Sequence, residues 1–410
     1  MAPTASLDFA GLQRFRTKSD DVETKTLVDQ HECEQSCGMF FFPLDLLPVD
    51  QQLQLQEHGF ANDALEPQLM RAKHAEYLSR ALSHLPSGFV SLDASRPWII
   101  YWILHALELL DRLPSDDFLS RSVETLGYFW NAQHGGFGGG VMQLGHTATT
   151  YASCLTLALV GTDAALETVD RQQLYRFFMS RKHHASGAFS AHEGGEVDLT
   201  SGVVDFVVSC QTYEGGFAGE PFNEAHGGYA FCAVATLWLL DAMDKIRDLD
   251  GLVHWITNRQ MPFEGGYQGR TNKLVDGCYS FWQGALPALL QEIADEKWGS
   301  SVYQCNREAL QRYILLCGQQ IEGGLRDKPG KPRDHYHSCY CLSGLSVAQH
   351  GLHPSLRRRA TTTTQETTPV VVGDASNLLV ATHPAYNIGV DKAARTLAYF
   401  RSKGAFVPEA

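Results

Sequence analysis

The chain has 410 residues, of which 44% are apolar and 19% are charged, so it can bury one large core or two smaller ones. Its net charge of −13 argues against nucleic acid as a bulk electrostatic partner, and any anion site must therefore be a local cluster of cations. No stretch approaches about 18 uncharged apolar residues, which argues against an integral membrane protein. Ten irregularly spaced cysteines and no apolar run at the N-terminus are typical of a cytoplasmic protein with reduced thiols.

Residues 1–70 are polar, and we expect an irregular N-terminal segment there. A helix is expected over 95–110, which begins with a serine cap and a proline in the first turn. Core packing explains aromatic residues on such a helix about as well as a hydrocarbon tunnel does. The aromatic residues on it are Trp98, Tyr101 and Trp102.

Glycine-rich turns recur between apolar segments of helical length, without convincing strand alternation. Helices that are apolar around most of their circumference are buried, whereas amphipathic helices lie outside them. Alternation of the two kinds predicts an all-α fold, an α/α toroid of inner and outer helices, over residues 71–410. An irregular helical bundle is the alternative.

The spacing of these turns is uneven. The marker glycines are Gly135, Gly187, Gly215, Gly265 and Gly323. Their intervals are 52, 28, 50 and 58 residues, so one interval is short by about 20 residues, the length of one helix and its turn. Only one helix fits in residues 196–211, and we expect that an inner helix is missing near 199–205.

Two segments, 224–232 and 263–282, carry donors suited to a phosphate or diphosphate. A pair of glycines in the first segment lets a ligand approach the backbone. An ion-paired surface loop and an ordinary helix-start turn are the alternative interpretation. The donors are His226, Arg270, Lys273 and Tyr279.

The second of these segments also contains half of a zinc site. Asp276 and Cys278 offer a carboxylate and a thiol from a turn that opens a helix. His337, which also opens an apolar helix, is the best third ligand, while His335 and Cys339 are competing ligands. Taken alone the pattern is weak, because surface aspartates, buried cysteines and structural histidines are common.

A low-complexity stretch at 357–374 contains a basic triplet followed by threonines. We expect a surface loop or disordered insert there, with a nuclear-import signal as the alternative.

Five segments of the chain, in order, closely resemble the signature segments of protein farnesyltransferase β subunits. They are DASRPWIIYWILHALELLD, EAHGGYAFC, FEGGYQGRTNKLVDGCYSFW, LRDKPGKPRDHYHSCYCLSGLS and THPAYNIG. The similarity runs from about residue 70 to the C-terminus. It implies an enzyme that transfers farnesyl from farnesyl diphosphate to a zinc-activated cysteine thiolate in C-terminal CaaX sequences, such as those of small GTPases. It also implies a heterodimer with an α subunit, without which this chain is inactive.

The resemblance further assigns roles to single residues. The zinc ligands correspond to Asp276, Cys278 and His337, and the aspartate that helps hold Mg²⁺ on the diphosphate corresponds to Asp327. The diphosphate pocket corresponds to His226, Arg270, Lys273 and Tyr279, of which the last two are also counted as catalytic. The isoprenoid pocket corresponds to Tyr151, Gly228, Tyr229, Cys232, Trp282, Trp98 and Tyr340. The site for the CaaX side chains corresponds to Trp98, Trp102 and Tyr336.

The resemblance also implies the length of the lipid. In this family a bulky pair closes the pocket floor for a fifteen-carbon chain, and Trp98 and Tyr340 occupy those positions. Five further carbons in a filled pocket would force strain or exclusion, so farnesyl is expected. Asp327 agrees, because the geranylgeranyl relatives do not depend on Mg²⁺ in this way.

One departure from the family pattern matters. After residues 196–198 the family continues with an arginine and a tyrosine on an inner helix, whereas Thr200 stands at the position of that arginine and the helix is absent. Two interpretations are alternatives to an active farnesyltransferase β subunit. One is a catalytically impaired splice or gene-model variant that still binds the α subunit, and the other is a type I geranylgeranyltransferase β subunit. Terpene cyclases share the toroid, but the sequence lacks the acidic motif that they need.

Overall fold

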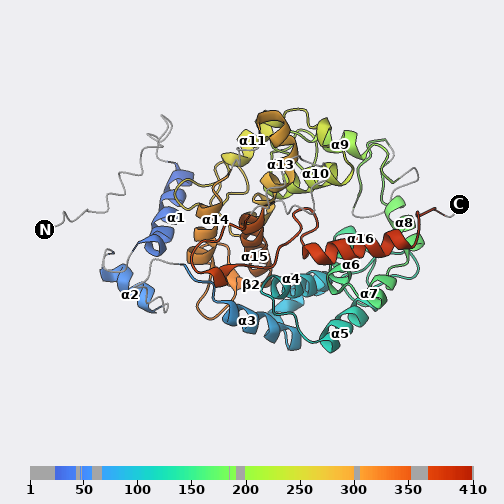
Figure 1. Ribbon diagram of the computed structural model, residues 1–410, viewed down its shortest axis with the longest axis horizontal. Coiled ribbons are helices and arrows are strands. Elements are labelled where there is room, and N and C mark those ends of the chain that lie inside the picture. Colours follow the sequence, from blue (N-terminus) through green and yellow to red (C-terminus); the bar gives the residue numbers. More distant parts are fainter. Residues whose placement is uncertain are drawn as a thin grey trace.

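The computed structural model of the chain describes residues 24–42, 47, 49–57, 67–183, 185–190, 199–299, 305–351 and 368–408. Regular structure in these residues is mainly helical (Figure 1). The α-helices are α1 (Lys25–Phe41), α2 (Val49–Glu57), α3 (Arg71–Ser83), α4 (Arg96–Leu109), α5 (Asp116–Gly127), α6 (Thr147–Val160), α7 (Asp163–Glu167), α8 (Arg171–Met179), α9 (Val203–Ser209), α10 (Gly227–Leu239), α11 (Leu249–Thr257), α12 (Tyr279–Trp282), α13 (Ala285–Trp298), α14 (Arg307–Tyr313), α15 (His335–His350) and α16 (Val390–Ser402). Shorter elements are the 3₁₀ segments η4 (Ser87–Ser95), η5 (Met243–Lys245) and η8 (Ala375–Asn377), the π-helical turn η6 (Ile314–Gly318), and the antiparallel strands β1 (Leu325–Arg326) and β2 (Arg333–Asp334).

Two kinds of helix alternate along the chain. Helices α4, α6, α10 and α15 are rich in apolar and small residues and bury most of them. Helices α5, α8, α11 and α16 bury one face only. The inner helices pack on one another, α4 against α6 and α15, and α12 against α10 and α15. Figure 1 shows α10 and α15 near the middle and α5, α8 and α11 at the periphery, as an α/α toroid requires.

A β-bridge closes the turn that follows each of several outer helices. The pairs are Trp130 with Phe137, Lys182 with Phe189, Gln211 with Phe217 and Gln260 with Tyr267. Glycine is needed where such a turn meets the next helix: Gly265 has φ +78°, and a Cβ there would lie 2.6 Å from the carbonyl oxygen of Ala309. These turns lead the chain into the starts of the inner helices.

Within the described residues, the repeat after α8 contains no inner helix. The next outer helix begins 34 residues after Phe137, 32 after Phe217 and 40 after Tyr267, but only 14 after Phe189. Helices α6 and α10 have 14 and 13 residues, and residues 199–202 of the short interval already form the turn into α9. The predicted absence of an inner helix near 199–205 is therefore confirmed.

The missing helix leaves the inner ring incomplete between α6 and α10. Within the described residues, these two helices lack the extensive interface that joins α4 to α6. Three residues on one stripe of α10 are exposed, Tyr229, Cys232 and Leu239, and Tyr151 on α6 is 41% exposed. Apolar surface on two inner helices is thus left uncovered.

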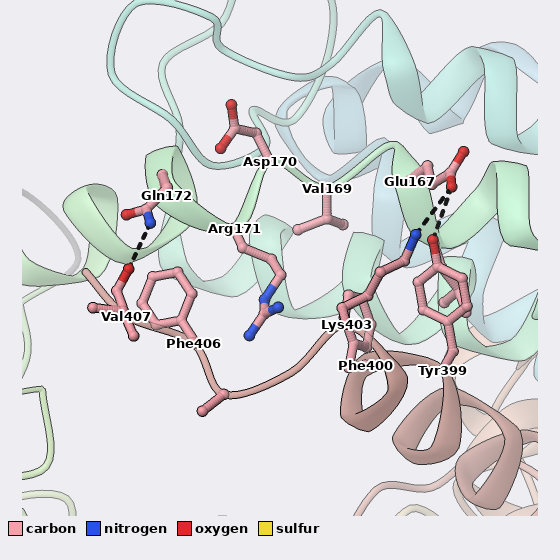
Figure 2. Close-up of a pocket in the computed structure, with 12 residues that line it drawn as sticks. Glu167, Val169, Asp170, Arg171, Gln172, Tyr399, Phe400, Lys403, Phe406 and Val407 are labelled. Carbon is pink, nitrogen blue, oxygen red and sulfur yellow. Dashed lines mark hydrogen bonds and ion pairs between the residues drawn. The ribbon is translucent and has the colours of Figure 1, made fainter. Parts of the chain in front are cut away.

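The C-terminal segment packs on α8, the outer helix of the shortened repeat (Figure 2). The guanidinium of Arg171 lies 5.7 Å from the ring centroid of Phe400 and 4.9 Å from that of Phe406. Gln172 Nε2 donates a hydrogen bond of 2.8 Å to the carbonyl oxygen of Val407. A surface cavity of about 490 Å³ remains between this segment and α8. The end of the chain therefore holds an outer helix that has no inner partner in its own repeat.

The N-terminal segment differs from the prediction, because α1 and α2 lie within it. Helix α1 packs on the toroid: Gln30 Nε2 donates to Glu264 Oε1 (2.9 Å), and the rings of Phe41 and Phe263 meet edge-on with centroids 5.9 Å apart. The buried residues of α1 are two cysteines and a glycine, so the helix has no aliphatic stripe that its sequence could reveal. The domain boundary at residue 70 stays a prediction.

The predicted insert at 357–374 is only partly described. Its residues 368–374 are anchored at two points, since Val372 is buried and the Val370 N–H donates to the carbonyl oxygen of Gln349 (2.9 Å). Gln311 Nε2 also donates to the carbonyl oxygen of Val370 (2.8 Å). Residues 368–374 contain no helix or strand, and Val370 and Val372 attach them to α14 and α15, while the prediction for 357–374 as a whole stays a prediction. Residues 357–367 lie outside the described residues.

We expect acid to destabilise the fold through His74. This buried side chain accepts from the Gly324 N–H through Nδ1 (2.8 Å) and donates to Gln319 Oε1 through Nε2 (2.7 Å), which only the neutral ring can do. Burial lowers the pKa of His74 to about 4. The unfolded chain then binds the proton more tightly, so about 3 kcal/mol of the free energy of unfolding is lost as the pH falls from about 6.5 to about 4.

Urea unfolding measured across this pH range checks the expectation. The His74→Gln variant should show a shallower pH dependence than the parent chain. His84→Gln, at an exposed histidine of the same region, is the matched control and should retain the parent slope. Equal slopes for the parent and His74→Gln would contradict the assignment.

Candidate metal centre and anion site

Three predicted ligands meet where α12 and α15 begin. One donor atom each of Asp276, Cys278 and His337 lies within 4.8 Å of the others, and Asp276 Oδ1 is 3.3 Å from His337 Nε2. A zinc ion with ligands at about 2.0–2.3 Å separates its donors by roughly 3.5 Å, so the cluster needs little closure to hold one. The competing candidate His335 is instead buried between Tyr77 and another ring, at a centroid distance of 4.9 Å from Tyr77.

Local structure explains how two neighbouring ligands face the same point. The Cys278 N–H donates to Asp276 Oδ1 (2.9 Å), and the Tyr279 N–H donates to the Asp276 carbonyl oxygen (3.1 Å), which defines a tight turn. Cys278 is 4% exposed, whereas the Asp276 side chain is 28% exposed. The turn therefore offers a sheltered thiol beside an accessible carboxylate.

Asp334 orients the third ligand, and the sequence analysis missed it. Its Oδ1 accepts from the His337 N–H (2.7 Å) and so caps α15, while its Oδ2 lies 2.6 Å from His337 Nδ1. The imidazole is thereby turned so that Nε2 faces Asp276. A signal was present in the sequence, since an aspartate immediately before a helical segment is a typical N-cap.

Electrostatics in the cluster favour a cation. Burial alone would lower the pKa of His337, but hydrogen bonds with Asp276 and Asp334 outweigh it and raise that pKa to about 9. Burial opposes ionisation of Asp276, but the hydrogen bond with His337 and that from the Cys278 N–H lower its pKa overall. Burial, then the charge of Asp276, raises the pKa of Cys278. A metal ion would take the place of the protons on the imidazole and the thiol.

The two predicted anion-binding cations lie at the ends of one β-turn. The Lys273 N–H donates to the Arg270 carbonyl oxygen (3.3 Å), and Asn272 between them has φ +59°. Such a turn brings its end residues within about 7 Å, which explains why cations three residues apart can converge. Arg270 Nη1 also pairs with Glu224 Oε2 (2.9 Å) in this structure, so part of the alternative interpretation, an ion-paired loop, is correct.

His226 and Tyr279 are hydrogen-bonded to each other beside this turn. His226 Nδ1 accepts from the Gly228 N–H (3.1 Å), so the proton on Nε2 is directed at the Tyr279 hydroxyl, 3.0 Å away. Burial and then Arg270 lower the pKa of His226. A Cβ at Gly269 would lie 2.0 Å from the Tyr279 ring, so glycine is required for the tyrosine to reach this position. The four predicted diphosphate donors thus come from two segments, one of which also carries the ligands Asp276 and Cys278.

Asp327, the predicted magnesium ligand, also borders the cluster. Its carbonyl oxygen accepts from the Gly277 N–H (2.7 Å), which ties the end of β1 to the ligand turn. Burial, then the charge of Asp276, raises the pKa of Asp327, and Lys328 opposes this from 2.5 Å. Lys328 is a second residue that the sequence analysis missed.

The predicted lipid and peptide residues form a continuous aromatic wall. Trp98 stacks on Trp102 (5.8 Å between centroids), Trp102 meets Tyr336 edge-on (5.4 Å), and Tyr336 contacts Tyr340 (4.8 Å). The wall ends at Trp282, which lies 4.4 Å from Tyr340 and donates through Nε1 to the Tyr336 hydroxyl (3.1 Å).

The remaining predicted lipid residues lie on α6 and at the start of α10. Tyr151 on α6 adjoins Trp98, with ring centroids 5.9 Å apart, and Tyr229 adjoins His226, with centroids 5.2 Å apart. Tyr229 and Cys232 are exposed, while Gly228 lies against the ring of His226. Tyr151 and Tyr229 thus lie on the two inner helices that border the missing one.

The sequence matches the family described as prenyltransferase alpha-alpha toroid domain over residues 69–201 and 199–388. It is 37% identical to the protein farnesyltransferase subunit beta of Arabidopsis thaliana, over 81% of this chain and 83% of that one. It is 36% identical to the same subunit of Schizosaccharomyces pombe, over 81% of this chain and 90% of that one. The chain belongs to the family of protein farnesyltransferase β subunits.

The family membership confirms the predicted toroid. A solved Candida albicans protein geranylgeranyltransferase-I complexed with GGPP has the same fold, with a TM-score of 0.64 and 20% identity over 80% of this chain and 98% of that one. The type-1 geranylgeranyl transferase subunit beta of Arabidopsis thaliana is 28% identical, less than the farnesyltransferase β subunits. None of the described helices has the length and apolar character needed to cross a bilayer.

The comparisons also bear on the missing helix. In the alignment with the Schizosaccharomyces pombe farnesyltransferase subunit, 81% of the 410 residues, about 332, are spread over 358 positions. The alignment therefore contains gaps in this chain, at positions where only the relative has residues. The two matches to the family overlap at 199–201, in the repeat whose described residues contain no inner helix.

Proposed function

We propose that the chain is the β subunit of a heterodimeric protein farnesyltransferase, which transfers farnesyl from farnesyl diphosphate to the cysteine of C-terminal CaaX sequences in the cytoplasm. The observation that carries this proposal is the position of an Asp–Cys–His cluster beside a cationic turn. Few reactions need both a thiolate-binding metal and a receptor for a phosphorylated leaving group. Proteins that end in CaaX, such as small GTPases, are the proposed acceptors.

Asp276, Cys278 and His337 are proposed to hold zinc. Their donor set of one carboxylate, one thiolate and one imidazole suits zinc and leaves a fourth position for the substrate. When bound, the metal would lower the pKa of the acceptor thiol so that a nucleophile exists at neutral pH. Asp334 keeps the imidazole of His337 facing the cluster throughout.

The leaving diphosphate is proposed to lie against Arg270, Lys273, His226 and Tyr279. Its negative charge grows as the bond from carbon to oxygen breaks, and fixed donors stabilise that charge without reorganising. Arg270 would exchange Glu224 for the diphosphate, because both partners are half exposed and their pairing is weak. The aromatic wall from Trp98 to Trp282 is proposed to hold the hydrocarbon chain and the CaaX side chains.

Asp327 is proposed to help hold Mg²⁺ on the diphosphate. We expect Asp327→Ala to leave the zinc content unchanged, to remove most of the Mg²⁺ dependence, and to slow transfer at saturating Mg²⁺ by about one to two orders of magnitude. Titrating transfer with Mg²⁺ measures this effect. Glu322→Ala, at an exposed carboxylate five residues earlier, should behave as the parent chain does. An unchanged Mg²⁺ response in Asp327→Ala would refute the role.

The proposed lipid has fifteen carbons. Tyr340 is 2% exposed, and Trp98 packs on both Trp102 and Tyr151. Neither side chain can therefore move aside to admit a longer isoprenoid. Preference for geranylgeranyl diphosphate over farnesyl diphosphate in direct competition would overturn this choice.

A second candidate function follows from the missing inner helix. A chain whose ring is incomplete between α6 and α10 could bind the α subunit and zinc without turning over substrate. Co-expression with the α subunit, followed by measurement of zinc content and farnesyl transfer to a CaaX peptide, separates the two. Transfer supports the first candidate, and an intact zinc-loaded heterodimer without transfer supports the second.

A further inference from the structure

The turn that carries Arg270 and Lys273 is anchored by a residue between them. Thr271 Oγ1 donates to Glu214 Oε2 (2.7 Å) and accepts from Arg259 Nη1 (2.5 Å). A hydroxyl is one of the few groups that can donate and accept at once, so Thr271 joins a carboxylate to a guanidinium. The chain of hydrogen bonds runs through the middle of the cationic turn.

The anchor points lie in well-packed parts of the toroid. Arg259 follows α11, is 7% exposed, and lies over the Trp255 ring at 5.6 Å. Burial lowers the pKa of Arg259, and the charge of Glu214 opposes this effect. Glu214 belongs to the turn that follows α9, so the turns after two successive outer helices, α9 and α11, hold the same threonine.

The base of the turn is fixed as well. The Gln268 N–H donates to the Arg259 carbonyl oxygen (2.9 Å), and Gln268 Oε1 accepts from the Lys273 N–H (3.0 Å). Without Thr271, the turn would keep these contacts near its base, its own Lys273-to-Arg270 hydrogen bond and the half-exposed pair of Arg270 with Glu224. Arg270 and Lys273 flank the threonine, so its position determines where both cations point.

We propose that Glu214, Thr271 and Arg259 form a positioning relay that holds the Arg270–Lys273 turn ready for a diphosphate. The inference rests on the proposed function, because the diphosphate is that of the prenyl donor. Holding the turn before binding spares the complex the entropic cost of ordering it, so the relay contributes to affinity. None of the three side chains needs to touch the ligand.

The Thr271→Val variant tests the relay, because valine keeps the volume and removes both hydrogen bonds. In the heterodimer, we expect the Kd of inorganic pyrophosphate and the KM of farnesyl diphosphate to rise about tenfold, with a smaller change in kcat and unchanged zinc content. Thr271→Ser restores the hydroxyl and should restore pyrophosphate affinity. Thr257→Val is the matched control, since the Thr257 hydroxyl bonds only carbonyl oxygens of its own helix, α11, and affinity should not change.

A second background shows whether the relay acts through the cations. When Arg270 and Lys273 are both replaced by alanine, adding Thr271→Val should weaken pyrophosphate binding no further. An additional tenfold loss in that background would overturn the proposal, because Thr271 would then act by another route.

Other outcomes also decide the matter. Parental pyrophosphate affinity in Thr271→Val, or failure of serine to restore it, would overturn the proposal. If Thr271→Val does not fold, Glu214→Ala removes the half-buried end of the relay. Parental pyrophosphate affinity in Glu214→Ala would also overturn the proposal. Absence of farnesyl transfer by the parent heterodimer would reject the proposed function, whereas the pyrophosphate measurements would still report on the relay.

Discussion

Replacing Cys278 by alanine is expected to release zinc and to stop transfer. Each ligand of a protein zinc site supplies about 3 kcal/mol of the binding free energy, so losing one weakens zinc binding by more than about a hundredfold. The cluster has three protein ligands, and its remaining imidazole and carboxylate already pair with each other at 3.3 Å, which favours the metal-free state. Zinc content of the purified heterodimer and transfer to a CaaX peptide measure the effect.

Cys339→Ala is the matched control for this variant. Cys339 is a buried thiol on α15, two residues beyond His337, and it does not belong to the cluster. It should lose some stability but keep stoichiometric zinc. Full zinc content in Cys278→Ala would mean that another group supplies the third ligand.

Replacing Glu108 by alanine is expected to lower the free energy of unfolding by about 3–5 kcal/mol, because its buried polar partners would lose their hydrogen bonds. Glu108 is 5% exposed, its Oε2 lies 3.0 Å from His105 Nδ1, and the same oxygen accepts from the Gly389 N–H at 3.0 Å. His105 Nε2 lies 3.0 Å from Asn387 Oδ1. These contacts join α4 to the turn before α16, and so close the ring between the first inner helix and the end of the chain.

Chemical denaturation of the purified heterodimer measures this loss. Glu76→Ala, at an exposed carboxylate that pairs with Arg80 on α3, should change the free energy of unfolding by less than about 1 kcal/mol. Glu108→Gln keeps an acceptor for the Gly389 N–H and should lie between the two. Equal stability for Glu108→Ala and Glu76→Ala would show that the buried contacts contribute little.

The sequence was sufficient to predict the toroid, the missing helix and the side chains that meet in the Asp–Cys–His cluster, for different reasons. Gly265 and the glycines of equivalent turns are required because the next helix approaches closely. The repeat can therefore be recognised from the sequence. A deletion changes the spacing of such markers whatever the packing is. His337 was preferred as the third ligand from the sequence pattern, which left His335 and Cys339 open, and the family resemblance and the geometry both agree with His337.

The parts that sequence could not predict are those that depend on long-range partners. Arg259, Glu214 and Thr271 lie in separate segments, and neither periodicity nor spacing relates them. Helix α1 was missed because its buried residues are small, although its side chains meet Glu264 and Phe263 across the chain. Ion pairing of Arg270 with Glu224 likewise depends on the folded loop.

The metal cluster joins two segments that lie far apart in the sequence, the turn at Asp276 and the start of α15 at His337. An ion bound only by the folded chain stabilises it by mass action, by about 4 kcal/mol when free metal exceeds the dissociation constant a thousandfold. If the cluster holds zinc as proposed, removing the ion would lower the free energy of unfolding of this chain. In a ring already short of one inner helix, a chelator and a denaturant would act in the same direction.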